Sequence, residues 1–154
     1  MSFSQPFQIV RAERDADIRS IAPLFDDYRV FYGQPSDEDA SYRFLRERWI
    51  ARESILFIAL GRVADPLGFV HLYPLFVSDR MLRLWLLNDL FVRPEARRSG
   101  LGRALMQRAE EHARETGSAG LTLSTAVDNT KAQGLYESDG YVRDDAFLHY
   151  NRFF

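Results

Sequence analysis

The chain contains no cysteine. This absence excludes disulfide bonds, a thiol nucleophile and any metal site built on cysteine. The sequence also has no stretch of about 18 consecutive apolar residues, which a membrane-spanning helix would need. Its first ten residues lack the basic segment and apolar run that are typical of a signal peptide. We therefore expect a cytoplasmic protein with no membrane partner.

An excess of positive charge is also absent. The chain has 20 lysines and arginines against 22 aspartates and glutamates, with a pI of about 5.9. Proteins that bind the nucleic-acid backbone normally carry a basic surface, so nucleic acid is not an expected partner. The histidines His71, His112 and His149 do not follow a metal-binding spacing, and no metal is expected. We expect His112, on a charged helix, to lie in solvent.

The remaining composition is that of one folded domain. The chain has 154 residues, of which 46% are hydrophobic and 14% aromatic. This length can bury one substantial core, and this composition does not favour disorder. No repeat, linker or low-complexity tract divides the sequence, so we expect a single domain over residues 1–154.

Hydrophobic periodicity and breaker residues predict the order of the elements. A first helix, kinked or starting late because of Pro23, should end at Gly33, and a second should begin near a cap at Ser36. Further helices should open at Gly100 and at Asn129. Strands are expected at residues 7–12, 55–60, 67–77, 81–92, 121–127, 141–143 and 147–153. This order, β-α-α-β-β-β-α-β-α-β-β, predicts an α/β protein with a mixed sheet and helices on both faces.

Residues 86–113 organise the rest of the chain. They read as an apolar strand that ends at Pro94, an arginine-rich turn, and an amphipathic helix that opens at Gly100. Glycines let a ligand approach the backbone, and the first N–H groups of a helix have no internal partner, so this turn is a predicted anion site. A P-loop is excluded because Arg103 follows Gly102. The dinucleotide fingerprint is excluded because Leu105 occupies the third glycine position.

The turn resembles the Q/R-x-x-G-x-G/A signature of the GNAT superfamily of acyl-CoA-dependent N-acetyltransferases. In that family, backbone amides of the turn hold the pyrophosphate of coenzyme A. Arg98 stands where many members carry glycine. The preceding strand, 88–92, resembles the one that runs beside the pantetheine arm, and the likeness extends over essentially the whole chain. It implies acetyl-CoA as cosubstrate, bound by Leu90, Phe91, Val92, Arg97, Arg98, Ser99, Gly100, Leu101, Gly102, Arg103, Asn129 and Tyr136.

Residues 129–136 resemble the family motif N-x-x-A-x-x-x-Y. The resemblance implies that the hydroxyl of Tyr136 points at the coenzyme sulfur and that Asn129 helps to place the cofactor. The alternative is that Tyr136 is a core aromatic residue with a satisfied hydroxyl. With the anion-binding turn upstream, we favour the catalytic role.

The general base is less defined. Related polyamine acetyltransferases carry a glutamate where this chain has Asn88, and asparagine cannot take a proton. Asp89 is adjacent, but strand alternation would turn it to the opposite face unless the strand bulges. We therefore expect a water-relayed base that ends at Asp89, Asp26, Asp27 or His71. Asn88, Asp89 and Tyr136 are the predicted catalytic residues, and a backbone N–H near Leu90 is implied to polarise the thioester carbonyl.

The acceptor site is expected beside the first helix. In the family, the acceptor-side helix falls where this chain has Asp26, Asp27, Tyr28, Phe31 and Tyr32, which can form an aromatic and acidic cup for a cation. An ordinary amphipathic helix is the equal alternative. His71 and Tyr73 on the third strand complete the predicted substrate-binding set, although His71 also fits a structural role.

The predicted activity is acetyl transfer to a primary amine. Without cysteine there can be no acetyl-cysteine intermediate, so the amine should attack directly in a ternary complex. The expected acceptor is a small amine, a polyamine or an amino acid, with a protein or peptide lysine as an alternative. A non-catalytic acyl-CoA-binding sensor is the other alternative, motivated by Asn88. Residues 147–154 are more apolar than a free edge tolerates, which favours a homodimer.

Overall fold

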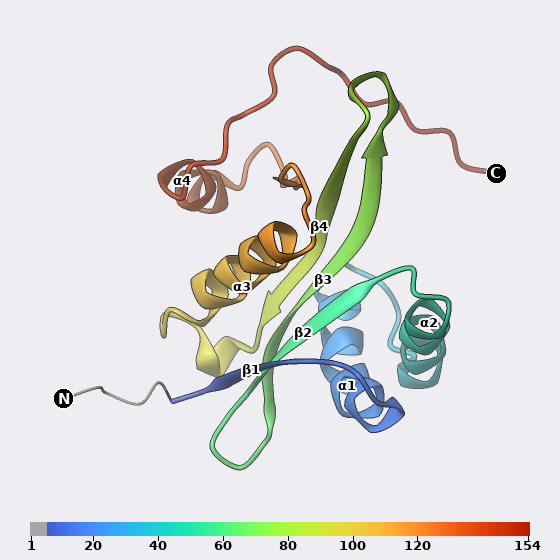
Figure 1. Ribbon diagram of the computed structural model, residues 1–154. Helices are drawn as coiled ribbons and strands as arrows, with labels where there is room; N and C mark the ends of the chain where they lie inside the picture. The colour runs from blue at the N-terminus through green and yellow to red at the C-terminus, as the bar shows by residue number, and fades with distance from the viewer. Residues whose placement is uncertain (1–5) are drawn as a thin grey trace. The chain divides into compact units, whose positions relative to one another are not determined.

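The computed structural model describes residues 6–154, and its centre is a five-stranded sheet in the order β1-β2-β3-β4-β5 (Figure 1). Adjacent strands are antiparallel, except that β4 and β5 run parallel. The strands are β1 (Gln8–Arg11), β2 (Ile55–Leu60), β3 (Pro66–Val77), β4 (Leu82–Val92) and β5 (Leu121–Thr122). Short 3-10 turns, η1 (Ser78–Arg80) and η2 (Pro94–Ala96), follow β3 and β4. The predicted mixed α/β fold is confirmed.

Four α-helices accompany the sheet in the described part of the chain: α1 (Asp15–Phe31), α2 (Glu38–Ile50), α3 (Leu101–Glu115) and α4 (Thr130–Ser138). Helix α1 begins at Asp15 and continues through Pro23, so the alternative of a late start is wrong. The cap of α2 is Asp37, not Ser36, because the Asp37 side chain accepts the backbone N–H of Ala40.

Each face of the sheet is covered by helices, with α1 and α2 on one face and α3 on the other (Figure 1). The α1 and α2 side buries a continuous cluster that includes Phe25, Leu45 and Phe69. On the other side, α3 buries Leu105 and Met106 completely. Such apolar burial is the main favourable contribution to folding, and here it holds both helical layers against the strands.

Gly68 on β3 allows α3 to approach the sheet closely. A Cβ at this position would lie 2.8 Å from Cδ2 of Leu101 and 2.8 Å from the carbonyl oxygen of Phe91. The backbone oxygen cannot move aside, so only glycine fits without a shift. Gly68 thus fixes the distance between the sheet and the first turn of α3, where the predicted anion site lies.

His112 is buried on α3, at 3% exposure, so its predicted place in solvent is wrong. Its ring packs 5.4 Å from Phe57 and 5.0 Å from Trp85. Position 112 lies seven residues after Leu105, two helical turns along the same stripe, which explains the burial. Burial, with the positive charges of Arg11 and Arg108, lowers the pKa of His112.

The chain divides into two compact units, one ending at Leu123 and one spanning Ser124–Phe154. In the second unit, α4 is capped by Asn129, whose side chain accepts the backbone N–H of Ala132. The predicted single domain stays a prediction.

Three predicted strands differ from the structure. The strand expected at 121–127 is only Leu121–Thr122, and no strand forms at 141–143 or 147–153. A strand exists only where a neighbouring backbone completes its hydrogen bonds, and a two-residue β5 offers very little edge for pairing. The apolar side chains from Phe147 to Phe154 are correspondingly exposed.

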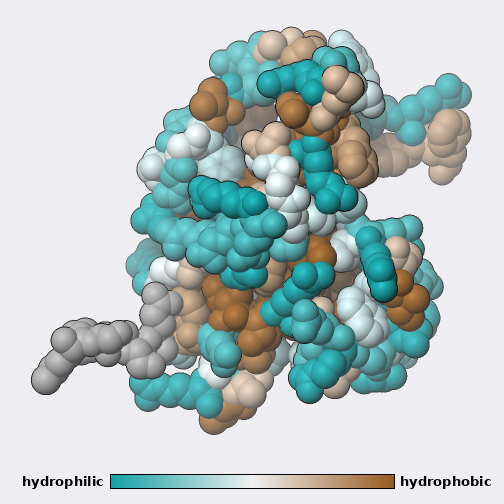
Figure 2. Space-filling view, in the orientation of Figure 1, coloured by the Kyte–Doolittle hydropathy of each residue, from teal (hydrophilic) through white to brown (hydrophobic). Residues whose placement is uncertain are grey.

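The surface is mixed in polarity. Figure 2 shows hydrophilic residues over most of the face seen there, interrupted by hydrophobic patches. None of the helices within residues 6–154 combines the length and the apolar character needed to cross a membrane.

Candidate active site

Strand β4 contains a β-bulge at Asn88. In its pairing with β3, Asp89 lies opposite His71, but Leu87 lies opposite Leu72. Asn88 is therefore the extra residue on β4, and it has no partner in the register. From the sequence, a catalytic role for Asp89 required a bulge here, because regular strand alternation would turn its side chain to the opposite face from Asn88.

The bulge turns the strand's side chains to different faces. Trp85 contacts His112 of α3, whereas Asp89 contacts Tyr28 of α1. Regular alternation would put positions 85 and 89 on one face. The extra residue thus lets one strand contribute to the α3 core and also place a carboxylate under α1.

Asp89 is a buried carboxylate with three side-chain partners. Its Oδ1 accepts hydrogen bonds from the Tyr28 hydroxyl at 2.6 Å and from Nδ2 of Asn88 at 2.9 Å. Its Oδ2 lies 3.1 Å from Nδ1 of His71. Only 5% of Asp89 is exposed, so water cannot solvate its carboxylate. The hydrogen bonds from these three side chains replace those that water would make. Four predicted site residues therefore meet at one point.

His71 makes its hydrogen bond through Nδ1 alone. Within residues 6–154, the hydrogen bond of this ring is the one from Nδ1 to Asp89, and none joins Nε2 to another protein atom. A carboxylate beside Nδ1 favours the tautomer with the proton on Nδ1, so Nε2 carries the lone pair. The ring is 1% exposed and lies 4.7 Å from the ring of Tyr73. The pair of Asp89 and His71 can therefore accept a proton at Nε2.

The tyrosines beside Asp89 are held in their neutral form. Burial, followed by the hydrogen bond to Asp89, raises the pKa of Tyr28 far above its usual value. Burial, with the charge of Asp89, raises the pKa of Tyr73 to about 12. Both phenols remain proton donors at neutral pH, so neither can serve as the base.

Asp26 lies apart from this network. Its carboxylate accepts from the hydroxyls of Ser36 and Ser41, from the backbone N–H of Asp37 and from Arg29. Burial alone would raise the pKa of Asp26, but these hydrogen bonds outweigh it and the pKa is lowered. The residue ties α1 to the start of α2, which is a structural role. Asp27 is exposed.

The turn before α3 presents unpaired backbone N–H groups. Gly100 is the N-cap of α3 with a φ of 80°, and no side chain caps the helix. Within residues 6–154, the N–H groups of Gly100, Leu101 and Gly102 donate to no backbone acceptor, and a Cβ at Gly100 would meet nothing within 4 Å. The helix dipole adds positive potential here. The turn thus meets the requirements for holding an anion.

Two arginines shape this turn. Nε of Arg97 donates to the carbonyl of Val92 at 3.0 Å, and its guanidinium lies 5.6 Å from the ring centroid of Phe91. Arg98 has a φ of 61°, the left-handed conformation that favours glycine. The sequence resemblance implied that glycine is common at this position, and Arg98 adopts the conformation that suits glycine while adding charge to the loop.

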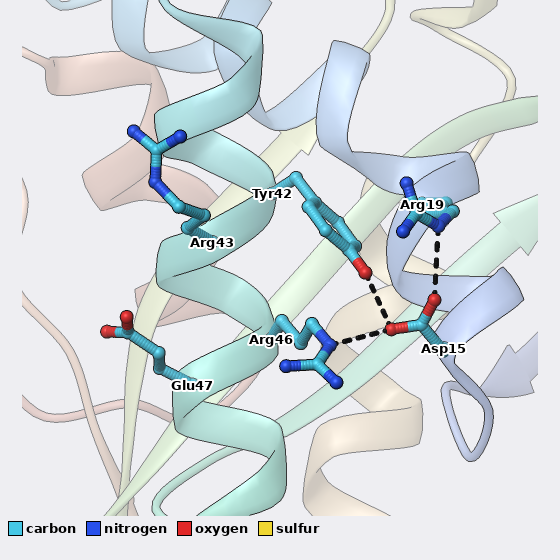
Figure 3. Close-up of a pocket in the computed structure, with 6 residues that line it drawn as sticks. All are labelled: Asp15, Arg19, Tyr42, Arg43, Arg46 and Glu47. Carbon is cyan, nitrogen blue, oxygen red and sulfur yellow. Dashed lines mark hydrogen bonds and ion pairs between the residues drawn. The ribbon is translucent and has the colours of Figure 1, made fainter.

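A separate surface pocket of about 410 Å³ lies between α1 and α2 (Figure 3). Asp15 accepts hydrogen bonds there from Tyr42 at 2.7 Å and from Arg46 at 2.9 Å, and Arg19 bonds its other oxygen. None of the predicted site residues lines this pocket. Its polar contacts join the two helices, and the candidate chemistry lies at Asp89 instead.

Tyr136 and Asn129 belong to the second unit. Tyr136 is half-buried on α4, and its ring lies 6.0 Å from that of Tyr141. Asn129 uses its side chain as the helix cap. Within the described residues, no three His, Asp or Glu side chains come together as a metal site.

Comparison with known proteins identifies the fold. The model of the acetyltransferase (GNAT) family matches residues 21–141. This chain belongs to the GNAT acetyltransferase family. The match confirms the expected family and the expectation of an acetyl-transferring enzyme.

Individual relatives agree with the family. An uncharacterized N-acetyltransferase, YhfO of Bacillus subtilis, is 43% identical to this acetyltransferase over 141 residues, or 92% of this chain and 94% of YhfO. A probable acetyltransferase of Haemophilus influenzae is 31% identical, over 81% of this chain and 84% of its own. The crystal structure of a probable acetyltransferase is 40% identical with a TM-score of 0.88, covering 96% of this chain and 97% of the other.

Some features of this acetyltransferase site could not be read from the sequence. The hydrogen bond from Tyr28 to Asp89 joins residues 61 positions apart. The stacking of Arg97 on Phe31 and Phe91 likewise has no local signal. The burial of His112, in contrast, follows from its spacing after Leu105 and could have been predicted.

Proposed function

We propose that this chain transfers the acetyl group of acetyl-CoA to a primary amine by direct attack in a ternary complex. The observation that carries the proposal is the buried pair of Asp89 and His71, held by Tyr28 beside the strand that leads into the anion-binding turn. The alternative of a non-catalytic sensor rested on Asn88 in place of a glutamate. Asp89, one position after Asn88, forms with His71 a pair that can accept a proton, which favours catalysis over the sensor.

The turn before α3 fits the pyrophosphate of coenzyme A. The N–H groups of Gly100, Leu101 and Gly102 would donate to phosphate oxygens, and Arg97, Arg98 and Arg103 would add positive charge. Strand β5 pairs with β4 only at Trp85 and Leu86, so it does not continue along the edge of β4 beyond Leu86. That edge offers backbone groups to the pantetheine arm, including the N–H near Leu90 for the thioester carbonyl.

Deprotonation of the acceptor falls to His71. An alkylammonium has a pKa of about 10.4, so at neutral pH the site must remove its proton before attack. Because His71 is 1% exposed, we propose that the proton reaches Nε2 through a bridging water. Asp89 keeps Nδ1 protonated and compensates the positive charge that forms on the ring.

The acetyl transfer itself also requires a proton for the sulfur that leaves. Acetyl-CoA supplies the thioester, whose C–S bond breaks as the amine nitrogen forms its bond to the acetyl carbon. The nitrogen carries a positive charge after the attack and releases its second proton to solvent water. The phenol of Tyr136 is proposed to give or share a proton with the leaving sulfur and to regain it from solvent, and Asn129 to help place the cosubstrate. Both roles rest on the likeness of residues 129–136 to the family motif. We also propose that residues 1–154 act as one domain.

A homodimer is proposed on the exposed apolar residues of the C-terminal segment. Phe147, Leu148, Tyr150 and Phe153 are each at least three-quarters exposed. Such a surface favours burial against another chain. Sedimentation of the full chain at several concentrations tests this proposal, and a monomer at all of them would contradict it.

The activity is tested by thiol release from acetyl-CoA over a panel of amines, together with the melting temperature. His71→Gln should lower kcat by a factor of about 10² to 10³ while the stabilisation by acetyl-CoA persists. The matched control is His149→Gln, at an exposed position outside the site. Stabilisation without turnover of any amine would favour the sensor. If neither acetyl-CoA nor coenzyme A raises the melting temperature, both functions fail.

A further inference from the structure

His71 is enclosed almost completely, with 1% of the residue exposed. Its aromatic and hydrogen-bonding neighbours within residues 6–154 are Phe25, Tyr73 and Asp89. The ring centroid of His71 lies 6.4 Å from that of Phe25 and 4.7 Å from that of Tyr73, and Nδ1 faces Asp89. A proton path from the surface to Nε2 needs a polar group beside the ring that is not already engaged.

Most of the groups near His71 cannot carry the proton. Phe25 has no polar atom in its side chain. Asp89 is buried, and both of its oxygens already have hydrogen-bond partners. The hydroxyl of Tyr28 is committed as well, since it donates to Asp89 at 2.6 Å. Tyr73 is thus the neighbour whose polar group remains available.

The side chain of Tyr73 leads from His71 to the surface. Tyr73 follows His71 by two positions on β3, so the two side chains lie on one face of the strand, and Tyr73 is half-buried. Within residues 6–154, neither its hydroxyl nor Nε2 of His71 bonds to another protein atom, yet neither is among the polar atoms that are sealed from solvent without a partner. Both atoms therefore touch solvent, and a water molecule can bridge them.

The phenol of Tyr73 is neutral at neutral pH. Burial, with the negative charge of Asp89, raises its pKa to about 12, against a smaller opposite influence of Arg48. A neutral phenol has one O–H donor and two lone pairs, so it can take up a proton on one side while it gives its own proton to the other. It can therefore pass a proton on without accumulating as a phenolate.

We propose that Tyr73 is a further catalytic residue, whose hydroxyl relays the proton of the acceptor ammonium to His71. This inference rests on the proposed function and adds one residue to its proton path. An N–H bond of the ammonium breaks as the phenol oxygen takes the proton, and the original O–H bond of the phenol breaks towards the bridging water. That water gives one of its protons to Nε2, where a new N–H bond forms. The phenol and the water end unchanged, and the free amine attacks the thioester with its lone pair.

The test measures kcat/KM of Tyr73→Phe over the amine panel with saturating acetyl-CoA. The substitution keeps the ring beside His71 and removes the hydroxyl alone. For ethylamine and other alkylamines, which are ammonium ions at neutral pH, kcat/KM should fall by about tenfold to a hundredfold. For trifluoroethylamine, whose fluorines withdraw electrons so that it is mostly free base, the change should stay below about twofold. The melting temperature and the KM for acetyl-CoA should not change.

A proton inventory gives a second readout. In mixtures of water and heavy water, kcat/KM for the alkylamines should depend on the deuterium content along a curve, because several protons move together. Tyr73→Phe should lose much of this curvature. Tyr42→Phe is the matched control, since its hydroxyl bonds Asp15 outside the site, and it should change neither measurement.

The outcomes distinguish the relay from the proposed function. Unaltered kcat/KM in Tyr73→Phe, or equal losses for alkylamines and trifluoroethylamine, would remove Tyr73 from the proton path and leave acetyl transfer standing. If trifluoroethylamine is not turned over, the proton inventory decides, and equal curvature in the two proteins overturns the relay. If the unmodified chain turns over no amine, the proposed function fails and the relay fails with it.

Discussion

The hydroxyl of Tyr28 on α1 donates a 2.6 Å hydrogen bond to Oδ1 of Asp89 on β4. This bond joins the acceptor-side helix to the bulged strand, and it orients the carboxylate that faces His71. A buried carboxylate that loses a donor must either move or take up water.

Removal of this donor should reduce activity more than stability. Tyr28→Phe should lower kcat/KM by about tenfold to a hundredfold, because hydrogen bonds to charged groups contribute about 1.5–3 kcal/mol. The control is Tyr42→Phe, which removes a similar 2.7 Å bond to Asp15 outside the site and should leave kcat/KM unchanged. Steady-state thiol release measures both variants. Equal losses in the two would contradict a special role for Tyr28.

Arg98 provides a test of the anion-binding turn. A residue other than glycine in the left-handed region carries a backbone cost of about 1 kcal/mol. Arg98→Gly should therefore keep or raise the melting temperature, yet weaken acetyl-CoA binding several-fold through the lost charge. The control is Arg52→Gly. Arg52 lies after the end of α2 with a φ of 56°, so this substitution removes the same backbone cost away from the turn. It should leave the Kd unchanged. Calorimetry at two salt concentrations measures the difference, and unaltered binding by Arg98→Gly would remove this residue from the site.

Tyr136→Phe tests the proposed proton donor. The substitution keeps the ring and removes only the hydroxyl, so kcat should fall by about tenfold or more with little change in the KM for acetyl-CoA. Tyr150→Phe, at a position 88% exposed in the same unit, is the control. A turnover number for Tyr136→Phe equal to that of the unmodified chain would assign Tyr136 to the core.

His112 should make the fold sensitive to mild acid. Its pKa is lowered by burial and by Arg11 and Arg108, against an ordinary value of 6.5. The unfolded chain therefore binds a proton more readily than the folded one. The stability is complete above about pH 6.5 and is lost as the pH falls towards the folded-state pKa.

The sign of this effect can be tested by replacement. Nε2 of His112 is buried with no hydrogen-bond partner in the described part of the chain, so His112→Leu removes a polar atom from the core and should not destabilise strongly. The melting temperature of His112→Leu should fall less between pH 7 and pH 5 than that of the unmodified chain. His149→Asn, at an exposed position, should retain the original slope. Parallel slopes for all three proteins would show that His112 does not titrate in this range.

Local patterns in the sequence predicted most of the elements. The apolar stripe of α3, including Leu105 and Met106, repeats at helical spacing and is buried. The apolar runs of β2, β3 and β4 likewise form strands close to their predicted bounds. These features depend on neighbours within one or two turns or along one strand, so the sequence alone contains enough information.

Features that depend on distant partners were not predictable. The bulge at Asn88 appears only when β4 is paired with β3, and a strand at 147–153 would need an edge that β5 does not supply. The candidate site residues Asp89, His71 and Tyr28 were named from the sequence, but their mutual contacts come from three separate elements. Residue type thus indicated the chemistry, and tertiary pairing determined the geometry.

The bulge also decides where β4 can change length. Asn88 is the surplus residue, so a deletion of this one codon would restore a regular ladder with Leu87 and Asp89 still opposite Leu72 and His71. Deletion of Leu86 would instead turn either Trp85 or Leu87 away from α3, because strand alternation would be broken on that side of the bulge. Position 88 is therefore where a residue can be removed from β4 to remodel the site without dismantling the fold.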